Sequence, residues 1–483
     1  MTHENSCEMY KKHRKSLIWF RRNLRLEDNQ ALWEGIQNSG SYLLLYIFDE
    51  KDWEDNPLGM RRSSDLKLNF IWQSVLDLKQ NIERKGGQLV IRKGNAIKII
   101  EEFLSESKFD ALYAPKEAGT EEAQVEKSIE ELCIRSKLEV NFYAQTTLFH
   151  EDDIPWPINK LPNIFTQFRK ENEKQTEVRE LFATPDDLSA SVKLIDDFQY
   201  ANLGIIETEI DEKSVLNFEG GESKAWERLN YYFWESSLLK EYKNTRNGLL
   251  GPDYSSKFSP WLAQGCISPK SIYYQVKKYE KERKKNQSTY WLIFELIWRD
   301  YFHFVLKKYG TKLFQKEGIK GEGVNWKWDL QVFEKWKNGE TGVPFIDANM
   351  NELNASGFMS NRGRQNVASF LVKDLGLDWR MGAWYFEHQL IDHDVASNWG
   401  NWAYVAGVGN DPRDNRYFNI LSQAKKYDSK GEYVRYWIPE LQEIEGFNIH
   451  KISLMKASEL KNIDNFIPEV YLKPTVDMGK WEY

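Results

Sequence analysis

An acidic, an aromatic and a basic side chain recur at helical spacing in one apolar stretch. Glu295, Trp298 and Arg299 occupy positions i, i+3 and i+4 of residues 291–301, so a helix would place them on one face. Most neighbouring residues are apolar, so we expect this helix to be buried and its charged groups to need partners. The spacing alone fits both a functional face and an internal Glu–Arg pair that braces neighbouring helices.

Hydroxyl groups gather before a proline in residues 254–262. Ser255 and Ser256 precede Ser259, which we expect to be the N-cap of a helix that starts at Pro260. Hydroxyls and backbone N–H groups at a helix N-terminus attract phosphate. An ordinary capped helix explains the same residues, and the motif alone favours that interpretation.

A compact polar cluster opens an apolar helix in residues 357–366. Arg362 and Arg364 stand beside Asn361 and Gln365, a combination that suits phosphate, amide or base-edge recognition. Helix capping together with surface arginines is the alternative.

An acidic cluster, Asp392-His393-Asp394, has residue types that bind metal ions. The chain has seven His and three Cys, and no second His/Cys cluster completes a site. We therefore predict no metal.

The N-terminal part of the chain alternates between strand and helix patterns. This alternation predicts a doubly wound, Rossmann-like parallel sheet in an α/β domain over 16–145, after an extension over 1–15. No GxGxxG follows the first strand and no P-loop motif occurs, so the sheet shows no nucleotide-binding signature. The apolar runs typical of buried strands are 16–20, 42–48, 88–91, 111–114 and 140–143; helical patterns cover 64–85, 96–105 and 121–137.

A proline-containing stretch with weak periodicity, 146–219, predicts an interdomain connection with some local helix. The rest of the chain, 220–483, predicts a large all-α domain. Its expected helices are 225–243, 260–264, 269–283, 288–309, 331–338, 346–356, 364–375 and 379–391.

Composition narrows the class of protein. No apolar run approaches the roughly 20 residues that cross a bilayer, so we expect no membrane association. The N-terminus lacks the apolar core of a signal peptide, and Glu4 and Glu8 argue against a transit peptide. Cys7, Cys133 and Cys266 are too widely spaced for a disulfide framework, which fits a reducing, cytoplasmic location.

The net charge and the aromatic content limit which molecules the protein can bind and how. The net charge of -7 means that a nucleic acid must bind to a local basic surface. The 19 Trp, 24 Tyr and 26 Phe residues form a large core, or include stacked rings that bind flat ligands or carry electrons.

Taken together, these segments resemble the photolyase/cryptochrome flavoprotein family, and most closely its cryptochrome DASH branch. Several long, uncommon motifs occur in the family's order over nearly the whole chain, the most specific being GETGVPFIDANM at 339–350. The other matching segments are 18–29, 257–269, 291–301, 358–371, 378–380, 398–402 and 407–413.

The resemblance implies an N-terminal antenna domain and a helical domain that encloses a U-shaped FAD. Its diphosphate and adenosine side would be lined by Tyr242, Ser255, Ser256, Lys257, Phe258 and Ser259. The rest of FAD would contact Glu295, Arg299, Asn361, Arg364, Asp392 and Asp394, with Asn398 near flavin N5. The two aspartates then act as hydrogen-bond acceptors rather than metal ligands.

The implied activity is light-driven repair of cyclobutane pyrimidine dimers in DNA. The dimer must leave the base stack to reach a buried flavin. Trp298 and Tyr404 would flank the flipped bases, Glu295 and Asn361 would hydrogen-bond the lesion, and Arg362 would contact the lesion or its phosphate.

Three tryptophans match the family's electron-transfer chain from flavin to surface, although each could instead be core packing. They are Trp402, Trp379 and Trp326, with Trp328 as an alternative outer member.

Two residues indicate the branch. Gln365 and Tyr404 stand where the long-known bacterial dimer photolyases carry Met and Trp, and both resemble cryptochrome DASH. A pocket with a weaker apolar grip cannot repay the cost of extracting a dimer from a duplex, so we expect repair mainly in single-stranded or looped DNA.

Three other activities are less well supported. The (6-4) photolyases need a His acid, whereas this region has Ser360, Asn361 and Gln365. A signalling photoreceptor usually lacks Asn at the position of Asn398 and carries a long C-terminal tail. A DNA-binding regulator without repair would lose Glu295 or the stacking aromatics, which are all present.

The resemblance also suggests a 5,10-methenyltetrahydrofolate antenna, with Glu117 as a contact for the pterin. A glutamate after a strand is more often a solvated loop residue. We expect a monomer, by the same resemblance.

Overall fold

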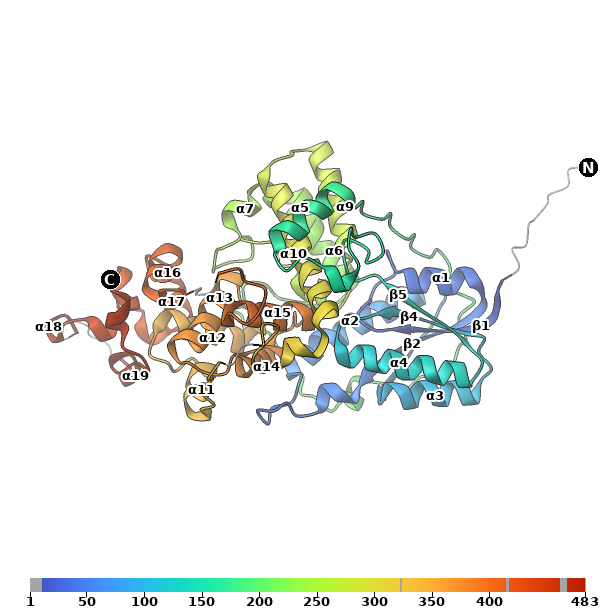
Figure 1. The fold of residues 1–483 in the computed structure, drawn as a ribbon, viewed down its shortest axis with the longest axis horizontal. Coiled ribbons are helices and arrows are strands. Elements are labelled where there is room, and N and C mark those ends of the chain that lie inside the picture. The colour runs from blue at the N-terminus through green and yellow to red at the C-terminus, as the bar shows by residue number, and fades with distance from the viewer. Residues whose placement is uncertain (1–10, 322–323, 414–416, 461–466, 483) are drawn as a thin grey trace, which may run out of the picture.

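A five-stranded parallel sheet forms the N-terminal α/β domain (Figure 1). The computed structural model describes residues 11–321, 324–413, 417–460 and 467–482. The strand order is β3-β2-β1-β4-β5, which confirms the predicted doubly wound sheet. The strands are β1 (His13–Phe20), β2 (Ser39–Asp49), β3 (Leu89–Gly94), β4 (Ala111–Lys116) and β5 (Glu139–Ala144).

Successive residues of the strands enter two different cores. In β1, Leu17 and Trp19 pack against α3 (Ala96–Glu106) and α4 (Thr120–Arg135), whereas Ile18 and Phe20 face a larger core shared with α2 (Asp65–Arg84). Because both faces of the sheet are buried, its strands appear in the sequence as continuous apolar runs. The connection between β1 and β2 contains α1 (Gln30–Asn38).

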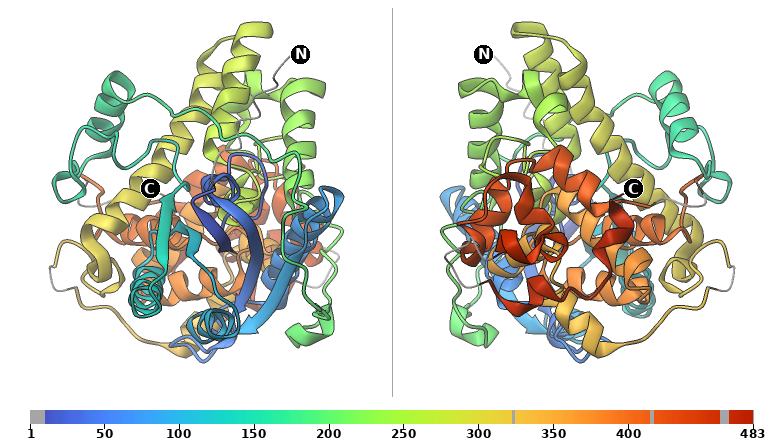
Figure 2. Two further views of the ribbon diagram at one scale, coloured as in Figure 1. Left: turned by 90° about the vertical axis from the view of Figure 1, so that its right-hand side faces the viewer. Right: turned by 90° about the vertical axis from the view of Figure 1, so that its left-hand side faces the viewer.

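The second half of the chain is helical, as predicted (Figure 2). Most of its buried apolar residues between 225 and 297 belong to the core shared with the sheet, whereas most of those that follow form a second core. Helices α10 (Gln287–Tyr309) and α15 (Val395–Ala406) pack together, and so do α14 (Trp379–Gln389) and α15. The helices of this domain are α6 (Glu222–Asn230), α7 (Tyr242–Thr245), α8 (Ser259–Ala263), α9 (Pro269–Glu282), α10 (Gln287–Tyr309), α11 (Leu330–Lys337), α12 (Pro344–Ser356), α13 (Asn361–Ser369), α14 (Trp379–Gln389), α15 (Val395–Ala406), α16 (Ile420–Tyr427), α17 (Glu432–Trp437), α18 (Ala457–Leu460) and α19 (Glu469–Leu472).

The connection between the two halves is anchored to the helical domain at one point and to the sheet at another. Near its start, the buried Asp300 carboxylate of α10 accepts hydrogen bonds from the backbone N–H groups of Leu148 (2.9 Å) and Phe149 (2.8 Å). Farther along, the Val192 N–H donates to the carbonyl oxygen of Tyr42 in β2. Between these points lies α5 (Phe165–Gln175).

Two predictions about helices were wrong in detail, and one helix beside the site was missed. The expected helix 225–243 is interrupted after α6 by a π-helical turn, Tyr231–Glu235, and a 3-10 turn, Leu238–Glu241. The expected helix 364–375 begins earlier, at Asn361, and its end is a π-helical turn, Phe370–Asp374. Helix α15 was not predicted. No helix in the described part of the chain combines the length and apolarity that crossing a membrane requires.

Candidate functional site

A cavity of about 430 Å³ opens among α8, α10, α13 and α15, within the range of small-molecule sites. It gathers residues that are more than a hundred positions apart. Of the residues predicted to bind FAD or the lesion, those that line it are Tyr242, Ser255, Ser256, Lys257, Phe258, Ser259, Glu295, Trp298, Arg299, Asn361, Arg364, Gln365, Asp392 and Tyr404.

The serine-rich segment forms one wall of this cavity. Arg228 holds its backbone in place, because the guanidinium donates to the carbonyl oxygens of Ser255 (3.1 Å) and Ser256 (3.1 Å). The prediction that Ser259 is an N-cap was wrong: α8 begins at Ser259 itself, and the preceding Phe258 is the cap residue.

Lys257 is the least expected member of this wall. Its backbone is left-handed (φ 58°) and its side chain is almost fully buried. The Nζ atom lies 3.1 Å from the centre of the Tyr254 ring and has no hydrogen-bond partner among the described residues. Burial lowers the pKa of Lys257 well below its usual value. A buried donor left unpartnered in this way fits a cavity that accepts a polar ligand.

Helix α10 presents Glu295, Trp298 and Arg299 to the cavity, as their spacing predicted. The internal Glu–Arg pair does not form, because each charge has another partner. Arg246 lies 2.7 Å from Glu295, whereas Arg299 donates to the carbonyl oxygen of Thr146 and lies 3.9 Å from Asp394. Burial raises the pKa of Glu295, and Arg246 opposes the rise.

The polar cluster at the start of α13 supplies a third wall. The Ser360 hydroxyl caps the helix by accepting the Gly363 N–H at 3.1 Å. Arg364 forms a two-pronged pair with Asp392, at 3.0 and 2.8 Å. Arg362 lies beside the lining and donates to Gln365 Oε1 (2.8 Å) and to Asn247 Oδ1 (3.1 Å).

The Asp-His-Asp cluster does not converge on one point. Asp394 accepts the Ser397 N–H as the N-cap of α15 and lies 3.0 Å from His303 Nε2. Although burial opposes it, His303 and Arg299 hold the pKa of Asp394 well below its usual range. Across the described residues, no three His, Cys, Asp or Glu side chains gather as a metal site.

Asn398 sits on α15 and is buried next to the cavity. Its amide donates to the carbonyl oxygen of Ala383 in α14 at 3.0 Å, and it is not among the lining residues.

The two predicted stacking aromatics meet at the cavity. Trp298 and Tyr404 are edge to face, with ring centres 6.0 Å apart. One face of Trp298 is covered by Phe165 of α5, at 3.5 Å between ring centres and 11° between planes. Phe165 belongs to the interdomain connection, where no motif predicts such a contact.

The predicted electron-transfer tryptophans lie on neighbouring elements. Trp402 packs so tightly on α14 that a Cβ at Gly382 would come within 2.1 Å of its ring, so only glycine fits there. Trp379 and Trp326 both donate their indole N–H to the carbonyl oxygen of Lys316, at 3.1 and 2.9 Å. Trp379 is fully buried, whereas Trp328 is 49% exposed.

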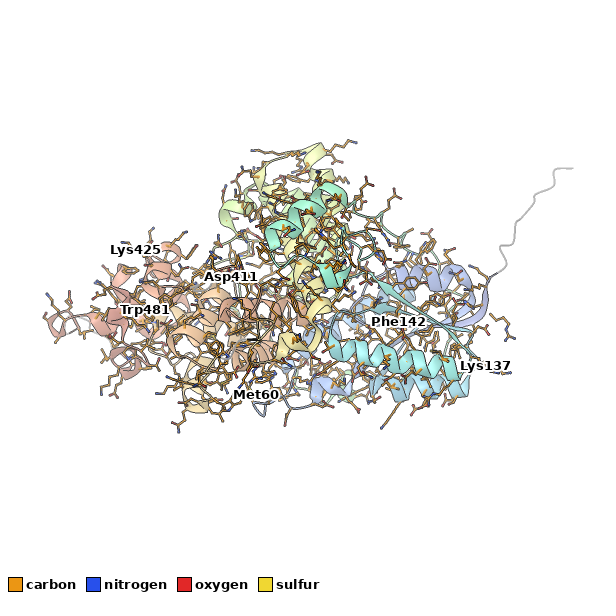
Figure 3. All side chains as sticks on the ribbon, in the orientation of Figure 1. Met60, Lys137, Phe142, Asp411, Lys425 and Trp481 are labelled. Atoms are coloured by element: carbon orange, nitrogen blue, oxygen red, sulfur yellow. The ribbon has the colours of Figure 1, made fainter. Side chains whose placement is uncertain are left out.

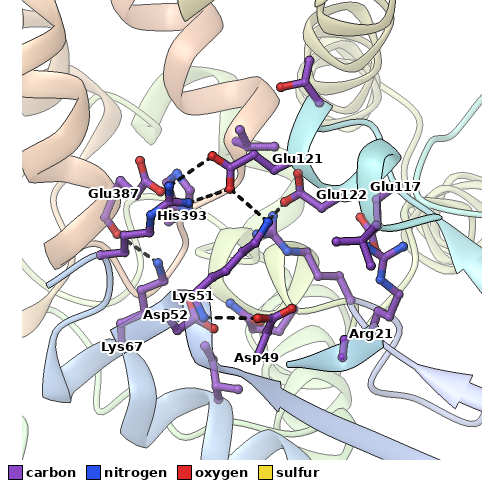
Figure 4. A pocket seen from close by; sticks show the side chains of 18 of the residues that line it. Arg21, Asp49, Lys51, Asp52, Lys67, Glu117, Glu121, Glu122, Glu387 and His393 are labelled. Carbon is purple, nitrogen blue, oxygen red and sulfur yellow. Dashed lines mark hydrogen bonds and ion pairs between the residues drawn. The ribbon is translucent and has the colours of Figure 1, made fainter. Parts of the chain in front are cut away.

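A second cavity, of about 440 Å³, lies between the α/β domain and the helical domain. Figure 4 shows Glu117 and His393 on opposite sides of it, with charged side chains between them. Both residues are buried. Within the described residues, Glu117 Oε1 and both ring nitrogens of His393 have no hydrogen-bond partner. Unpartnered buried acceptors and donors on facing walls fit a polar ligand between them.

Comparisons with known proteins identify the family. Two family models match: DNA photolyase over residues 16–186, and the FAD binding domain of DNA photolyase over residues 291–482. The protein named cryptochrome DASH from Xenopus laevis is 45% identical over 472 residues, which are 95% of this chain and 89% of that protein. The chain belongs to the photolyase/cryptochrome family.

A bacterial relative is about as similar, and two solved structures share the fold. Cryptochrome DASH from Gloeobacter violaceus is 44% identical and spans 96% of this chain and 93% of its own length. The crystal structure of the cryptochrome from Synechocystis sp. PCC6803 superposes with a TM-score of 0.93, at 44% identity and 97% coverage of each chain. A class III photolyase from Agrobacterium tumefaciens gives a TM-score of 0.86 at 28% identity, covering 99% of this chain and 97% of that one.

The family assigns FAD to the helical domain, and the first cavity has the residues to hold it. Hydroxyls and the unpartnered Lys257 line one wall, and the Arg364–Asp392 pair lines another. Sequence reasoning missed Arg246 and Phe165, which contact Glu295 and Trp298, because neither lies in a motif. It likewise treated His393 only as a metal ligand.

Proposed function

We propose that this protein uses blue light to repair cyclobutane pyrimidine dimers, preferentially in single-stranded or looped DNA, and that it acts as a monomer. One observation carries the proposal: Glu295, Trp298, Asn361, Gln365 and Tyr404 line the same cavity as the residues suited to FAD. Family membership and the likeness to photolyases support an activity of this class.

When bound and reduced, FAD supplies an excited electron that splits the cyclobutane bonds and then returns. The chain's own residues bind and orient the flipped dimer. Trp298 and Tyr404 stack on or flank its bases, at about 1–3 kcal/mol per base. Phe165 covers one face of Trp298, and Phe302 also stacks on this ring at 5.6 Å, so the two phenylalanines hold the indole in one orientation.

Glu295 and Asn361 provide fixed polar groups at the lesion. Because Arg246 pairs with Glu295, the carboxylate keeps one orientation before the lesion arrives. Preorganised groups of this kind stabilise the charge that develops on the dimer without a cost of reorganisation. Arg362 lies beside them and is available to a DNA phosphate after release from Gln365 or Asn247.

Preference for single strands follows from two residues. Gln365 is polar, and its Oε1 atom accepts a hydrogen bond from Arg362. Tyr404 has a smaller ring than the Trp of bacterial dimer photolyases. The pocket therefore gains less free energy from a flipped dimer. In a single strand, the base pairs that oppose flipping are absent.

For the second cavity we propose a 5,10-methenyltetrahydrofolate antenna. Glu117 is buried rather than solvated, and its unpartnered Oε1 can accept a hydrogen bond from the amino group of a pterin. His393 supplies a further partner from the facing wall. Reconstitution of Glu117→Ala with the folate tests this: bound pigment, measured by near-ultraviolet absorbance, should fall strongly. The control Glu131→Ala, an exposed residue of α4 outside the cavity, should retain the pigment.

For electron supply to FAD we propose the chain Trp402, Trp379 and Trp326. Trp379 and Trp326 share one carbonyl acceptor, which holds the two indoles close together. Oxidation of each ring in turn would carry an electron from the surface inward.

A repair assay separates the enzyme from a photoreceptor. The FAD-loaded, chemically reduced protein is illuminated with a single-stranded oligonucleotide that carries one thymine dimer. Restoration of the thymines supports the proposal. If FAD is bound and reduced but no thymines are restored, the proposal is wrong and a blue-light photoreceptor becomes the better assignment.

A further inference from the structure

Four tryptophan rings form a continuous series from the interior to the surface. Trp379 meets Trp399 edge to face, with ring centres 5.6 Å apart. Trp399 meets Trp384 at 5.9 Å, and Trp384 meets Trp328 at 6.1 Å. All three distances lie within the range of aromatic pairs in contact. The series begins at a fully buried ring and ends at one that is 49% exposed.

This series leaves Trp379 in a different direction from the proposed chain. Trp326 is linked to Trp379 through the carbonyl oxygen of Lys316. Trp399 instead belongs to α15, where it stands one helical turn before Trp402. Trp379 is therefore a junction between two sets of rings.

The series also follows the wall of the second cavity. Trp384 and Trp399 both line that cavity, and Phe314, another lining residue, packs edge to face on Trp399 at 5.0 Å. Structural packing alone does not require that each ring in the series be an indole, because phenylalanine fills a similar apolar space. Only the indole can be oxidised readily.

The charges near the middle of the series are balanced. The Arg380 guanidinium lies 5.5 Å from the centre of the Trp384 ring, which on its own would oppose a positive charge there. Asp378 pairs with Arg380 at 2.7 Å and offsets that charge. Trp384 can therefore carry a positive charge transiently. The exposed Trp328 is the ring at which water stabilises that charge best.

We propose that Trp399, Trp384 and Trp328 form a second electron route, which branches from the proposed chain at Trp379. This inference rests on the proposed role of Trp379. After Trp379 has lost one electron, Trp399 returns it, Trp384 reduces Trp399, and Trp328 reduces Trp384. The remaining Trp328 radical cation releases its indole proton to water. A thiol then donates one hydrogen atom, which restores Trp328 and leaves a thiyl radical that pairs with another as a disulfide.

Because either route could supply electrons alone, a variant that blocks both routes tests whether the second one exists. Photoreduction of bound FAD under a thiol is measured in Trp326→Phe, in Trp384→Phe and in the double variant. Each single variant should retain photoreduction through the other route. The double variant should fall roughly tenfold or more below either one. The control is Trp481→Phe, a buried indole at the far end of the helical domain from the sheet (Figure 3).

Two results would overturn the branch. One is a loss of photoreduction in Trp326→Phe alone, which would show that the branch carries no electrons. The other is a double variant that keeps the photoreduction of Trp326→Phe, which would show that Trp384 is not needed. In either case, loss of photoreduction in Trp379→Phe shows that the main chain still stands. Normal photoreduction in Trp379→Phe contradicts the chain and the branch together.

A second readout does not depend on the yield of reduced flavin. The protein is illuminated in aerated buffer without thiol, and oxidised tryptophan is mapped by mass spectrometry. Light-dependent oxidation at Trp328 is expected, with a loss of most of it in Trp384→Phe and none in Trp481→Phe. Equal oxidation of Trp328 in Trp384→Phe would contradict the proposed route.

Discussion

The Glu295 carboxylate lies 2.7 Å from a guanidinium nitrogen of Arg246, a residue that no motif connects to it. Arg246 follows directly after α7, and α7 packs on α10, which carries Glu295. The pair fixes the carboxylate at the rim of the cavity where Trp298, Asn361 and Gln365 also lie. The acid at the candidate lesion site is therefore positioned by a second element.

Removal of the Glu295 carboxylate should weaken repair but spare FAD binding. In Glu295→Ala, the lesion loses a charge-assisted partner, and we expect a loss of roughly tenfold or more in repair yield. The FAD content, measured by absorbance, should stay close to that of the parent protein. Glu173→Ala, on the exposed side of α5, is the matched control and should repair normally. Full repair by Glu295→Ala would exclude this role.

Trp379→Phe separates electron supply from repair. The variant should lose photoreduction because no readily oxidised ring remains at the junction. Repair by the chemically reduced variant should match that of the parent protein. These two measurements are made on the same preparation, with dithionite as the reductant. A variant that photoreduces normally would show that the proposed chain is wrong.

Asp300 should make the free energy of unfolding depend on pH. Burial raises the pKa of Asp300 to about 7, against about 3.9 in an unfolded chain. Between these values the folded state holds a proton that the unfolded state has released. The stability contributed by this group is therefore present below about pH 4 and is lost as the pH rises to about 7.

Asp300→Asn tests that dependence. The variant removes the titration, so the slope of the unfolding free energy between about pH 4 and pH 7 should become less negative, by up to about 1.4 kcal/mol per pH unit. Loss of one acceptor for the Leu148 and Phe149 N–H groups should lower stability overall by about 1–3 kcal/mol. Asp186→Asn, an exposed control on the connection, should leave the slope unchanged. Identical slopes in all three proteins would contradict the assignment.

Gln365 and Tyr404 can be changed together to strengthen the apolar grip on a flipped dimer. The variant Gln365→Met with Tyr404→Trp should raise repair of a dimer in duplex DNA and change single-strand repair little. Repair rates on matched oligonucleotides measure the effect. If duplex repair does not rise, these two residues do not set the preference.

The sheet and the helical domain could be predicted because their signals are local. Both faces of the sheet are buried, so β2 and β3 appear as apolar runs without alternation. Helix α15 escaped prediction because its apolar and small residues surround the helix, which erases the amphipathic period. The π-helical turn Tyr231–Glu235 gave no capping or proline signal before the chain left the α-helix. The domain limits drawn from the sequence stay predictions.

The types of residue at the site could be predicted from the sequence, but the residues that contact them could not. Helical spacing placed Glu295, Trp298 and Arg299 on one face, and the structure confirms that face. Their partners come from Arg246, Phe165 and Thr146, which lie far away in sequence and carry no motif. Long-range pairs of this kind are set by tertiary packing, which a single sequence does not reveal.

The most direct test of the account is a comparison of one thymine dimer in matched single-stranded and duplex oligonucleotides. Both are illuminated with blue light in the presence of the reduced, FAD-loaded protein, and restored thymines are counted over time. We expect rapid repair of the single strand and little repair of the duplex. Equal repair of the two substrates would contradict the single-strand preference. Absence of repair in both, with FAD bound and reduced, would contradict the proposed activity itself.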